Sequence, residues 1–138
     1  MASSIFLDTN GWLALLNSVE VLHGQADRVW RNIVTGKHRI VLTDWIVAET
    51  GNGMARSHEK GRLLESLDRV MRNPRCELVF VDSELLRRSL DFFSRHHDKS
   101  WGLIDCASFV VMQERSIAEA FTSDLHFEQA GFKCLLSA

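Results

Sequence analysis

The sequence predicts an α/β sandwich with a mostly parallel central sheet. Short apolar runs bounded by turn residues alternate with amphipathic helical patterns along the chain, as in parallel strands joined by helical crossovers. The chain has 138 residues, of which 46% are hydrophobic and 25% are charged, as is typical of one globular domain with one core. Because we find no internal repeat, linker or low-complexity segment, we expect a single domain over residues 1–138.

The first half of the chain predicts two strands and four helices. The run Ser3–Asp8 reads as a short buried strand that ends in an acid, and Asn10 reads as the N-cap of the following helix. Asn73-Pro74 ends the last helix of this half. The other expected elements are a helix over Val21–Val34, a strand over Arg39–Leu42, a helix from Trp45 to about Ser57 that Thr43 or Asp44 caps, and a helix over Gly61–Arg72.

The second half continues the same alternation and includes the most apolar helix of the chain. This helix runs from Leu103 to about Arg115, after a polar loop over His96–Gly102. The other expected elements are a strand over Glu77–Val81, a helix over Ser83–Arg95, a strand over Glu119–Thr122, a helical turn over Leu125–Ala130 and a last strand over Phe132–Leu136.

Composition excludes several classes of protein. The apolar stretches are far shorter than the roughly 20 residues that a membrane-spanning helix needs. The start, Met1–Ser4, has no basic region, so we do not expect a secretory signal. Three widely spaced cysteines are typical of reduced thiols in a cytoplasmic protein. A net charge of −2 means that any contact with nucleic acid must come from a local basic face.

Four acidic residues, each in or beside an apolar run, are the strongest functional signal. They are Asp8, Glu49, Asp105 and Asp124. Removing an ionised carboxylate from water costs several kcal/mol unless a counter-charge or a metal compensates it, so four such residues predict a shared cation. Asp8 ends the first strand and Asp124 follows the Glu119–Thr122 strand, so both should face one crevice at the carboxyl edge of the sheet. Oxygen ligands of this kind favour Mg²⁺ or Mn²⁺ over Zn²⁺.

Three of the four acids also have a simpler interpretation when each is taken alone. Asp8 and Asp124 are candidates for helix caps, and Glu49 for a solvated helix position. His126 either contacts a substrate or lies on the surface. Cys106 lacks a patterned histidine partner, so a small buried residue explains it better than a nucleophile does. Only the joint occurrence of the four acids favours a metal site.

The ordered motifs resemble the PIN-domain family of metal-dependent ribonucleases, and within it the VapC-type toxins of bacterial toxin–antitoxin pairs. The resemblance covers nearly the whole chain and rests on Asp8-Thr9-Asn10, Val47-Ala48-Glu49, Asp105 in an apolar helix, and the run Thr122-Ser123-Asp124-Leu125-His126-Phe127. It implies a three-layer α/β/α sandwich and a cytoplasmic Mg²⁺- or Mn²⁺-dependent endoribonuclease. It also implies an antitoxin protein as partner and a homodimer.

On this resemblance the four acids, Asp8, Glu49, Asp105 and Asp124, are both the catalytic and the metal-binding residues. A hydroxyl of the family's last motif falls on Thr122, and Thr9 is a further supporting group beside Asp8. The hypothesis is that Asp8, Asp105 and Asp124 hold one or two ions, while Glu49 completes the site or orients the attacking water.

Candidate contacts with RNA and with a partner lie outside the acidic set. The basic residues Arg56, Lys60 and Arg62 follow Glu49 and flank the predicted crevice, where phosphate contacts would position a strand. Trp101 lies in the loop before Asp105 and is a candidate for stacking on a base, with ordinary packing or a dimer contact as alternatives. The apolar surface of Trp12–Val34 is the expected docking region for an antitoxin.

Two other functions remain open at this point. One is phosphoryl transfer through an aspartyl nucleophile at Asp8, although Asn10 stands where haloacid-dehalogenase-like proteins have a second aspartate. The other is a non-catalytic interaction module that keeps the PIN fold.

Overall fold

The central layer of the protein is a five-stranded parallel sheet. The computed structural model describes residues 3–138, so residues 1–2 of the predicted domain lie outside the described part of the chain. The strands follow one another in space in the order β3-β2-β1-β4-β5, with every neighbouring pair parallel. Their bounds are β1 Ser4–Leu7, β2 Arg39–Thr43, β3 Cys76–Val79, β4 Glu119–Phe121 and β5 Lys133–Cys134.

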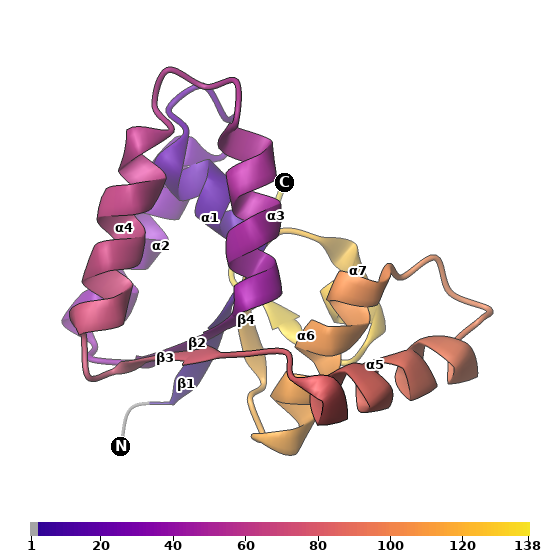
Figure 1. Ribbon diagram of the computed structural model, residues 1–138. Coiled ribbons are helices and arrows are strands. Elements are labelled where there is room, and N and C mark those ends of the chain that lie inside the picture. The colour runs from indigo at the N-terminus through magenta and orange to yellow at the C-terminus, as the bar shows by residue number, and fades with distance from the viewer. Residues whose placement is uncertain (1–2) are drawn as a thin grey trace.

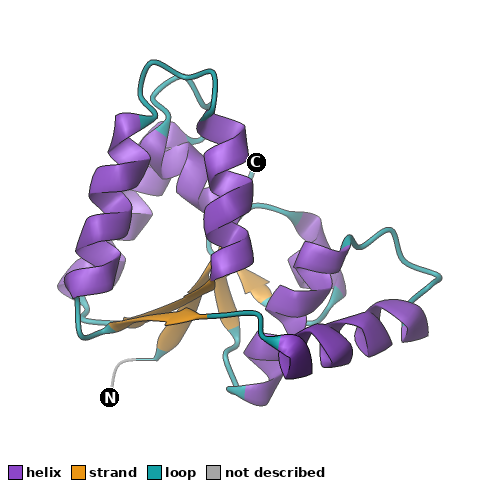
Figure 2. Cartoon of the chain, in the orientation of Figure 1, coloured by secondary structure: helices purple, strands orange, loops and turns teal. Residues whose placement is uncertain are grey.

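Helices cover both faces of this sheet (Figures 1 and 2). From β1 the chain moves outward to β2 and β3, and it then crosses back to β4 and β5. Because parallel crossovers are right-handed, this reversal places the two sets of helices on opposite faces. The first set is α1 (Thr9–Leu16), α2 (His23–Thr35), α3 (Asp44–Met54) and α4 (Gly61–Arg72); the second is α5 (Ser83–Arg95), α6 (Leu103–Glu114) and α7 (Leu125–Gln129). The predicted three-layer architecture is confirmed.

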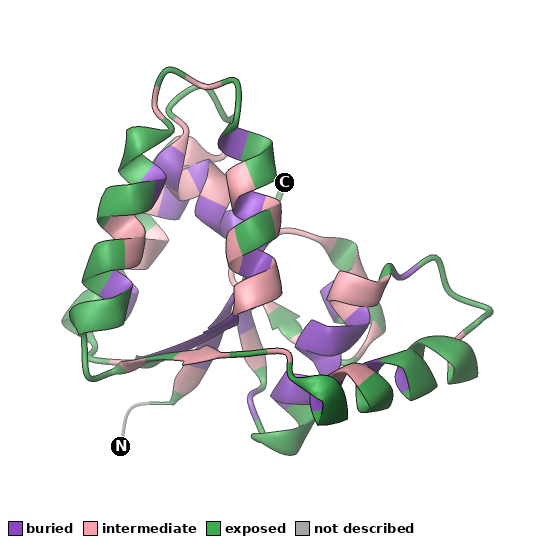
Figure 3. Ribbon diagram, viewed as in Figure 1, coloured by how far each residue is buried: buried purple, intermediate pink, exposed green. Residues whose placement is uncertain are grey.

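The core lies on both sides of β1 and along α6 (Figure 3). Phe6 and Leu7 of β1 are both fully buried although they point to opposite faces. This is expected because a parallel sheet covered on both faces has continuously apolar strands. In α6, every residue from Cys106 to Met112 is buried, which explains why this helix is the most apolar in the sequence.

A glycine allows α1 to approach the end of β4. A Cβ atom at Gly11 would collide with the backbone carbonyl of Phe121, so no larger residue fits at this point. Since β1 and β4 are neighbours, with Leu7 opposite Phe121, the residues that follow these two strands emerge side by side. This is the point where the strand order reverses, the usual place of a ligand site in an open α/β sheet.

Most boundary differences from the sequence prediction are small. The helix after β1 begins at Thr9, so Asn10 is not its N-cap, and that prediction was wrong. Helix α3 ends at Met54 rather than near Ser57, and the last strand shortens to Lys133–Cys134. No helix among residues 3–138 is long and apolar enough to cross a bilayer.

Candidate functional site

Asp8 is a buried carboxylate at the carboxyl end of β1. Only 5% of the residue is exposed, and it occupies the N-cap position of α1 with an extended backbone. Its side chain makes no capping hydrogen bond, so the simpler interpretation as a helix cap does not describe it. Instead, Asp8 Oδ2 accepts a hydrogen bond of 2.8 Å from the Thr122 hydroxyl across the sheet.

The other three acids surround Asp8 closely enough to change its titration. The pKa of Asp8 is raised from 3.8 to about 7. Burial is the largest cause of this rise, the Thr122 hydrogen bond opposes it, and the charges of Asp105, Glu49 and Asp124 add to it. These carboxylates come from α6, α3 and the start of α7, so the fold gathers four distant segments at one place. Like charges held this close need a cation if all are to ionise.

Asp105 and Asp124 are both held at helix N-termini. Asp105 Oδ2 accepts a 3.3 Å hydrogen bond from the backbone N–H of Gly102, the residue that precedes α6. Burial raises the pKa of Asp105, and the hydrogen bond with His126 opposes this rise. Asp124 Oδ1 accepts from the backbone N–H of His126 at 2.9 Å and caps α7. Each helix therefore orients its carboxylate toward the site and stabilises the charge.

His126 joins these two acids, a role that the sequence pattern underrated. Its Nδ1 lies 3.1 Å from Asp105 Oδ2 and 3.6 Å from Asp124 Oδ1. Candidate ligand atoms of these three residues all lie within 4.8 Å of one another, a spacing that one metal ion can bridge. The residue is partly buried rather than on the open surface. Its position two residues after Asp124 was the available signal.

Thr122 and Thr9 have different roles. The buried Thr122 hydroxyl donates to Asp8 and accepts from the backbone N–H of Asp124 at 3.1 Å, so it links two of the acids. The Thr9 hydroxyl instead donates to the carbonyl of Ile46 at 3.4 Å and accepts from Thr50 at 3.2 Å. Thr9 therefore ties α1 to α3 and does not contact the Asp8 carboxylate. Thr9 was expected as a supporting group beside Asp8, and its hydroxyl bonds to α3 instead.

Asn10 is a site residue that the sequence pattern misassigned. Its Oδ1 accepts hydrogen bonds from the Ser123 backbone N–H at 2.8 Å and from the Ser123 hydroxyl at 3.0 Å. These contacts fasten the loop after β4 to the first turn of α1. The loop carries Asp124, so Asn10 helps to fix the distance between Asp8 and Asp124. Its amide is a standard N-cap group, which is why the sequence pattern pointed to the wrong role.

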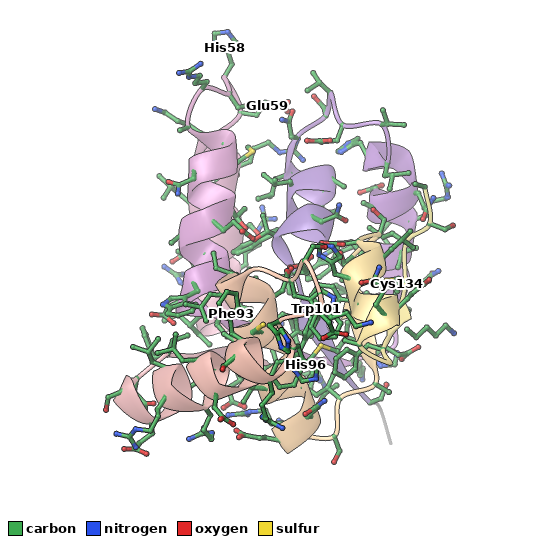
Figure 4. The ribbon with its side chains drawn as sticks, turned by 90° about the vertical axis from the view of Figure 1, so that its right-hand side faces the viewer. His58, Glu59, Phe93, His96, Trp101 and Cys134 are labelled. Atoms are coloured by element: carbon green, nitrogen blue, oxygen red, sulfur yellow. The ribbon has the colours of Figure 1, made fainter. Side chains whose placement is uncertain are left out.

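Two other sequence candidates lie in unsuitable surroundings. Trp101 is only 6% exposed and packs edge-on against Phe109, with its indole N–H donating to Gln129 at 3.0 Å. Figure 4 shows Trp101 beside His96, whose ring centroid lies 5.2 Å away. This ring is a core residue, so the suggested stacking on a base was wrong. Burial raises the pKa of the Cys106 thiol to about 11, so this thiol is no activated nucleophile.

The basic residues after Glu49 lie at the end of α3 that is far from the sheet. Figure 4 shows their neighbours His58 and Glu59 at the tip of the α3–α4 loop. The Arg62 guanidinium donates to Glu59 at 2.9 Å, and Glu59 also accepts from the Ser18 hydroxyl. Glu49 lies five residues before Met54, the last residue of α3, which is about 7.5 Å of helical rise, and Arg56 lies beyond that end of the helix. Arg56 and Lys60 are both exposed there.

The donor set fits a divalent cation bound by oxygen ligands. Four carboxylates this close together, one of them buried, repel one another unless a cation joins them. Carboxylate oxygens suit Mg²⁺ and Mn²⁺, and the imidazole of His126 is also compatible with Mn²⁺. Asp105, Asp124 and His126 have ligand atoms close enough to share one ion, and the buried Asp8 adds a carboxylate near enough to feel the charges of Asp105 and Asp124.

Comparison with known proteins agrees with this geometry. The family model described as "PIN domain" matches residues 5–133. The curated protein "23S rRNA-specific endonuclease VapC20" from two strains of Mycobacterium tuberculosis, CDC 1551 / Oshkosh and ATCC 25618 / H37Rv, is 30% identical over 130 residues. That alignment covers 93% of this chain and 95% of VapC20.

A solved structure supports the same relationship. The crystal structure of M. tuberculosis VapC20, described as a sarcin–ricin loop cleaving toxin, superimposes with a TM-score of 0.79 at 25% identity. The superposition covers 93% of this chain and 95% of that structure. Since the family model spans nearly all of the chain, the resemblance inferred from the four acids is confirmed. The chain belongs to the PIN-domain family.

Proposed function

We propose that this protein is a divalent-metal-dependent endoribonuclease and the toxin of a type II toxin–antitoxin pair. The observation that carries the proposal is the convergence of three acids, from three other segments, on the buried Asp8. PIN-domain membership and the likeness to VapC20, named as a 23S rRNA-specific endonuclease, support it.

The direct test is cleavage of an RNA hairpin that carries the sarcin–ricin loop of 23S rRNA, the element in the description of the VapC20 structure. We expect cleavage with Mg²⁺ or Mn²⁺ and none after chelation by EDTA. Undiminished cleavage in EDTA would rule out the metal-dependent mechanism. A protein that cuts other RNAs but not this hairpin would keep the nuclease assignment and reject this substrate.

The residues divide the work of phosphodiester hydrolysis. Asp8, Asp105 and Asp124 would hold the ion, which lowers the pKa of a bound water and stabilises charge on the phosphoryl oxygens. Glu49, whose charge reaches Asp8, would orient the attacking water. Thr122 fixes the rotamer of Asp8, and His126 does the same for Asp105.

The alternative functions receive less support from the structure. An aspartyl nucleophile at Asp8 would be assisted by a second carboxylate two residues later, but this position is Asn10, whose amide is engaged with Ser123. A non-catalytic module would not need to keep four acids at a cost in stability. The acids are all present and gathered, so we favour the enzyme.

A threonine pair offers a matched test of how Asp8 is supported. Thr122→Val removes the hydroxyl that donates to Asp8. We expect a roughly 10- to 100-fold loss of metal affinity or cleavage, the usual effect of deleting a hydrogen bond to a metal ligand. Thr9→Val removes another buried hydroxyl, one that bonds to α3 instead. We expect it to change metal affinity and cleavage less than threefold. Equal losses in both variants, measured by Mn²⁺ titration and by cleavage rate, would refute the assigned role of Thr122.

We also propose that Arg56 and Lys60 contact phosphates of the bound RNA on the strand leaving the acidic cluster. Replacing both by Ala should weaken binding to all RNA sequences alike. It should also flatten the dependence of log K on log [salt] by about 1.4, because each cation that neutralises a phosphate of a single strand adds about 0.7 to this slope. Fluorescence anisotropy with a single-stranded oligonucleotide measures both effects.

The control for this pair is Arg72→Ala, which removes an exposed arginine paired with Asp68 on the outer side of α4. We expect its salt dependence to match that of the wild type. An unchanged slope in the Arg56 and Lys60 double variant would remove these residues from the interface.

The antitoxin and the assembly state complete the proposal. Exposed apolar side chains lie along the predicted docking region, with Val19 82%, Val21 97% and Val34 60% exposed. A groove of about 340 Å³ runs between α1, α2 and α4 and is lined by Leu16, Trp30 and Val70 among others. An antitoxin helix would lay its apolar face there. We propose that the enzyme works as a homodimeric single-domain protein in the cytoplasm. Sedimentation would test the homodimer, and co-expression with the neighbouring reading frame would test the antitoxin.

A further inference from the structure

A second groove opens beside the acidic cluster and is not needed to hold a metal. It has a volume of about 430 Å³, within the range of roughly 300–1,000 Å³ typical of small-ligand pockets. Two elements from different parts of the chain form it, α3 and the first turn of α6. Its lining residues are Trp45, Ala48, Glu49, Asn52, Leu103 and Ile104.

The lining of α3 follows directly from helical periodicity. Positions 45, 48, 49 and 52 are spaced i, i+3, i+4 and i+7, so they share one face of the helix. Trp45 is the aromatic member of this face and is only partly buried. Trp12 and Trp101, by contrast, are buried, and their indole N–H groups donate to Ser66 and Gln129.

The groove is continuous with the proposed metal site. Glu49 belongs to both, and Ile104 directly precedes Asp105 in the chain. A nucleotide next to a phosphate held at the acids can therefore reach this groove. Glu49 is the one charged residue among those that line it, so the groove repels a phosphate and favours a neutral group. The exposed Asn52 at its far end offers both a hydrogen-bond donor and an acceptor.

We propose that this groove binds the base of a nucleotide that flanks the scissile phosphate, with Trp45 as the stacking surface and Asn52 as a contact to the base edge. The proposal rests on the proposed ribonuclease function and names a specificity-determining part of the same site. A flat, neutral and aromatic group fits the shape and charge of the groove. Stacking on an aromatic side chain is a common way to bind single-stranded bases. Trp45 then selects an unstacked nucleotide, which favours a loop or single strand over a duplex.

A double-mutant cycle in cleavage rate tests the stacking contact. The substrate is the sarcin–ricin loop hairpin, intact or with an abasic site at the nucleotide on either side of the cleaved bond. With intact RNA, Trp45→Ala should lower kcat/KM by about 5- to 150-fold, and Trp45→Phe should restore most of this loss. With RNA that lacks the stacked base, wild type and Trp45→Ala should be equally slow. Equal penalties from Trp45→Ala on intact and abasic RNA would overturn the proposal.

Controls separate this contact from folding and assembly. Leu64→Ala removes an apolar side chain that is 69% exposed on α4 and outside the groove, and it should leave cleavage unchanged. Thermal unfolding checks that Trp45→Ala is folded. If Trp45→Ala instead changes the sedimentation of the protein and leaves the base dependence intact, the groove is an interface between copies of the chain and the proposal fails.

A binding measurement tests whether Trp45 contacts a nucleotide base even if the hairpin is not cut. The indole N–H resonance of Trp45 is assigned by its loss in Trp45→Phe and followed during titration with each nucleoside 5′-monophosphate. We expect a saturable shift with at least one nucleotide and none with ribose 5-phosphate, which lacks the base. No shift, or an equal shift with the sugar phosphate, would overturn the base site. If the wild-type protein cleaves no RNA but shows a base-dependent shift, the result counts against the ribonuclease function and not against the base site.

Discussion

Replacing Asp8 by Asn is expected to lower RNA cleavage by more than a hundredfold while the protein stays folded. Losing a group that only supports a metal ligand costs roughly 10- to 100-fold, and losing the ligand itself should cost more. The fold should survive because Asn keeps the shape of the side chain and still accepts the Thr122 hydrogen bond of 2.8 Å. The cleavage rate and the thermal unfolding curve are the two measurements.

A charge-matched control is available on the far helix layer. Asp91→Asn removes an exposed carboxylate that pairs with Arg95 on α5, so it changes the net charge by the same amount away from the site. We expect its cleavage rate to stay within twofold of wild type. If Asp8→Asn cleaves RNA as fast as this control, Asp8 is not a metal ligand.

The stability of the metal-free protein should fall as pH rises from about 4 to 7. The pKa of Asp8 rises from 3.8 in the unfolded chain to about 7 in the fold, so the folded state binds the extra proton within this window. The contribution of Asp8 to the free energy of unfolding is then highest below pH 4, and it drops by on the order of 4 kcal/mol by pH 7. The raised pKa of Asp105 acts in the same direction.

The Asp8→Asn substitution and the addition of Mg²⁺ should each remove this loss of stability at higher pH. The variant cannot titrate at position 8, so its unfolding free energy should depend less on pH, and metal-free Asp8→Asn should be the more stable protein at pH 8. Mg²⁺ binds the ionised carboxylates and should stabilise wild type increasingly as pH rises. Urea unfolding between pH 4.5 and 8, with and without Mg²⁺, checks both. Identical pH dependence in the two proteins would refute the assigned titration of Asp8.

The fold was predictable because its periodic patterns are strong. Apolar runs such as Ile5–Leu7 are buried on both faces of a parallel sheet, and no other arrangement covers them as well. The helix boundaries were less predictable where a polar side chain has two possible uses. Asn10 has the chemistry of an N-cap, but its amide instead accepts hydrogen bonds from Ser123, a residue 113 positions away. Such a long-range contact leaves no trace in local sequence.

The composition of the site was predictable for a similar reason. An acid in an apolar run, such as Asp8 or Asp105, conflicts with its surroundings, and that conflict marked the site. The tryptophans carry no such conflict, since an aromatic residue suits either a core or a groove. Trp101 was expected near the crevice and is buried, whereas Trp45 lines the groove. For each tryptophan, only the packing of its segment against the neighbouring elements decides between a core and a groove.

Anomalous X-ray scattering from a crystal soaked in Mn²⁺ tests most directly the claim that Asp8, Asp105 and Asp124 hold a metal ion beside Glu49. We expect a strong peak within about 2–2.5 Å of carboxylate oxygens of Asp8, Asp105 and Asp124. A second peak roughly 3.5–4 Å from the first would show a two-ion site. A soaked crystal with no peak among these carboxylates, or with Mn²⁺ bound elsewhere on the protein, would contradict the claim.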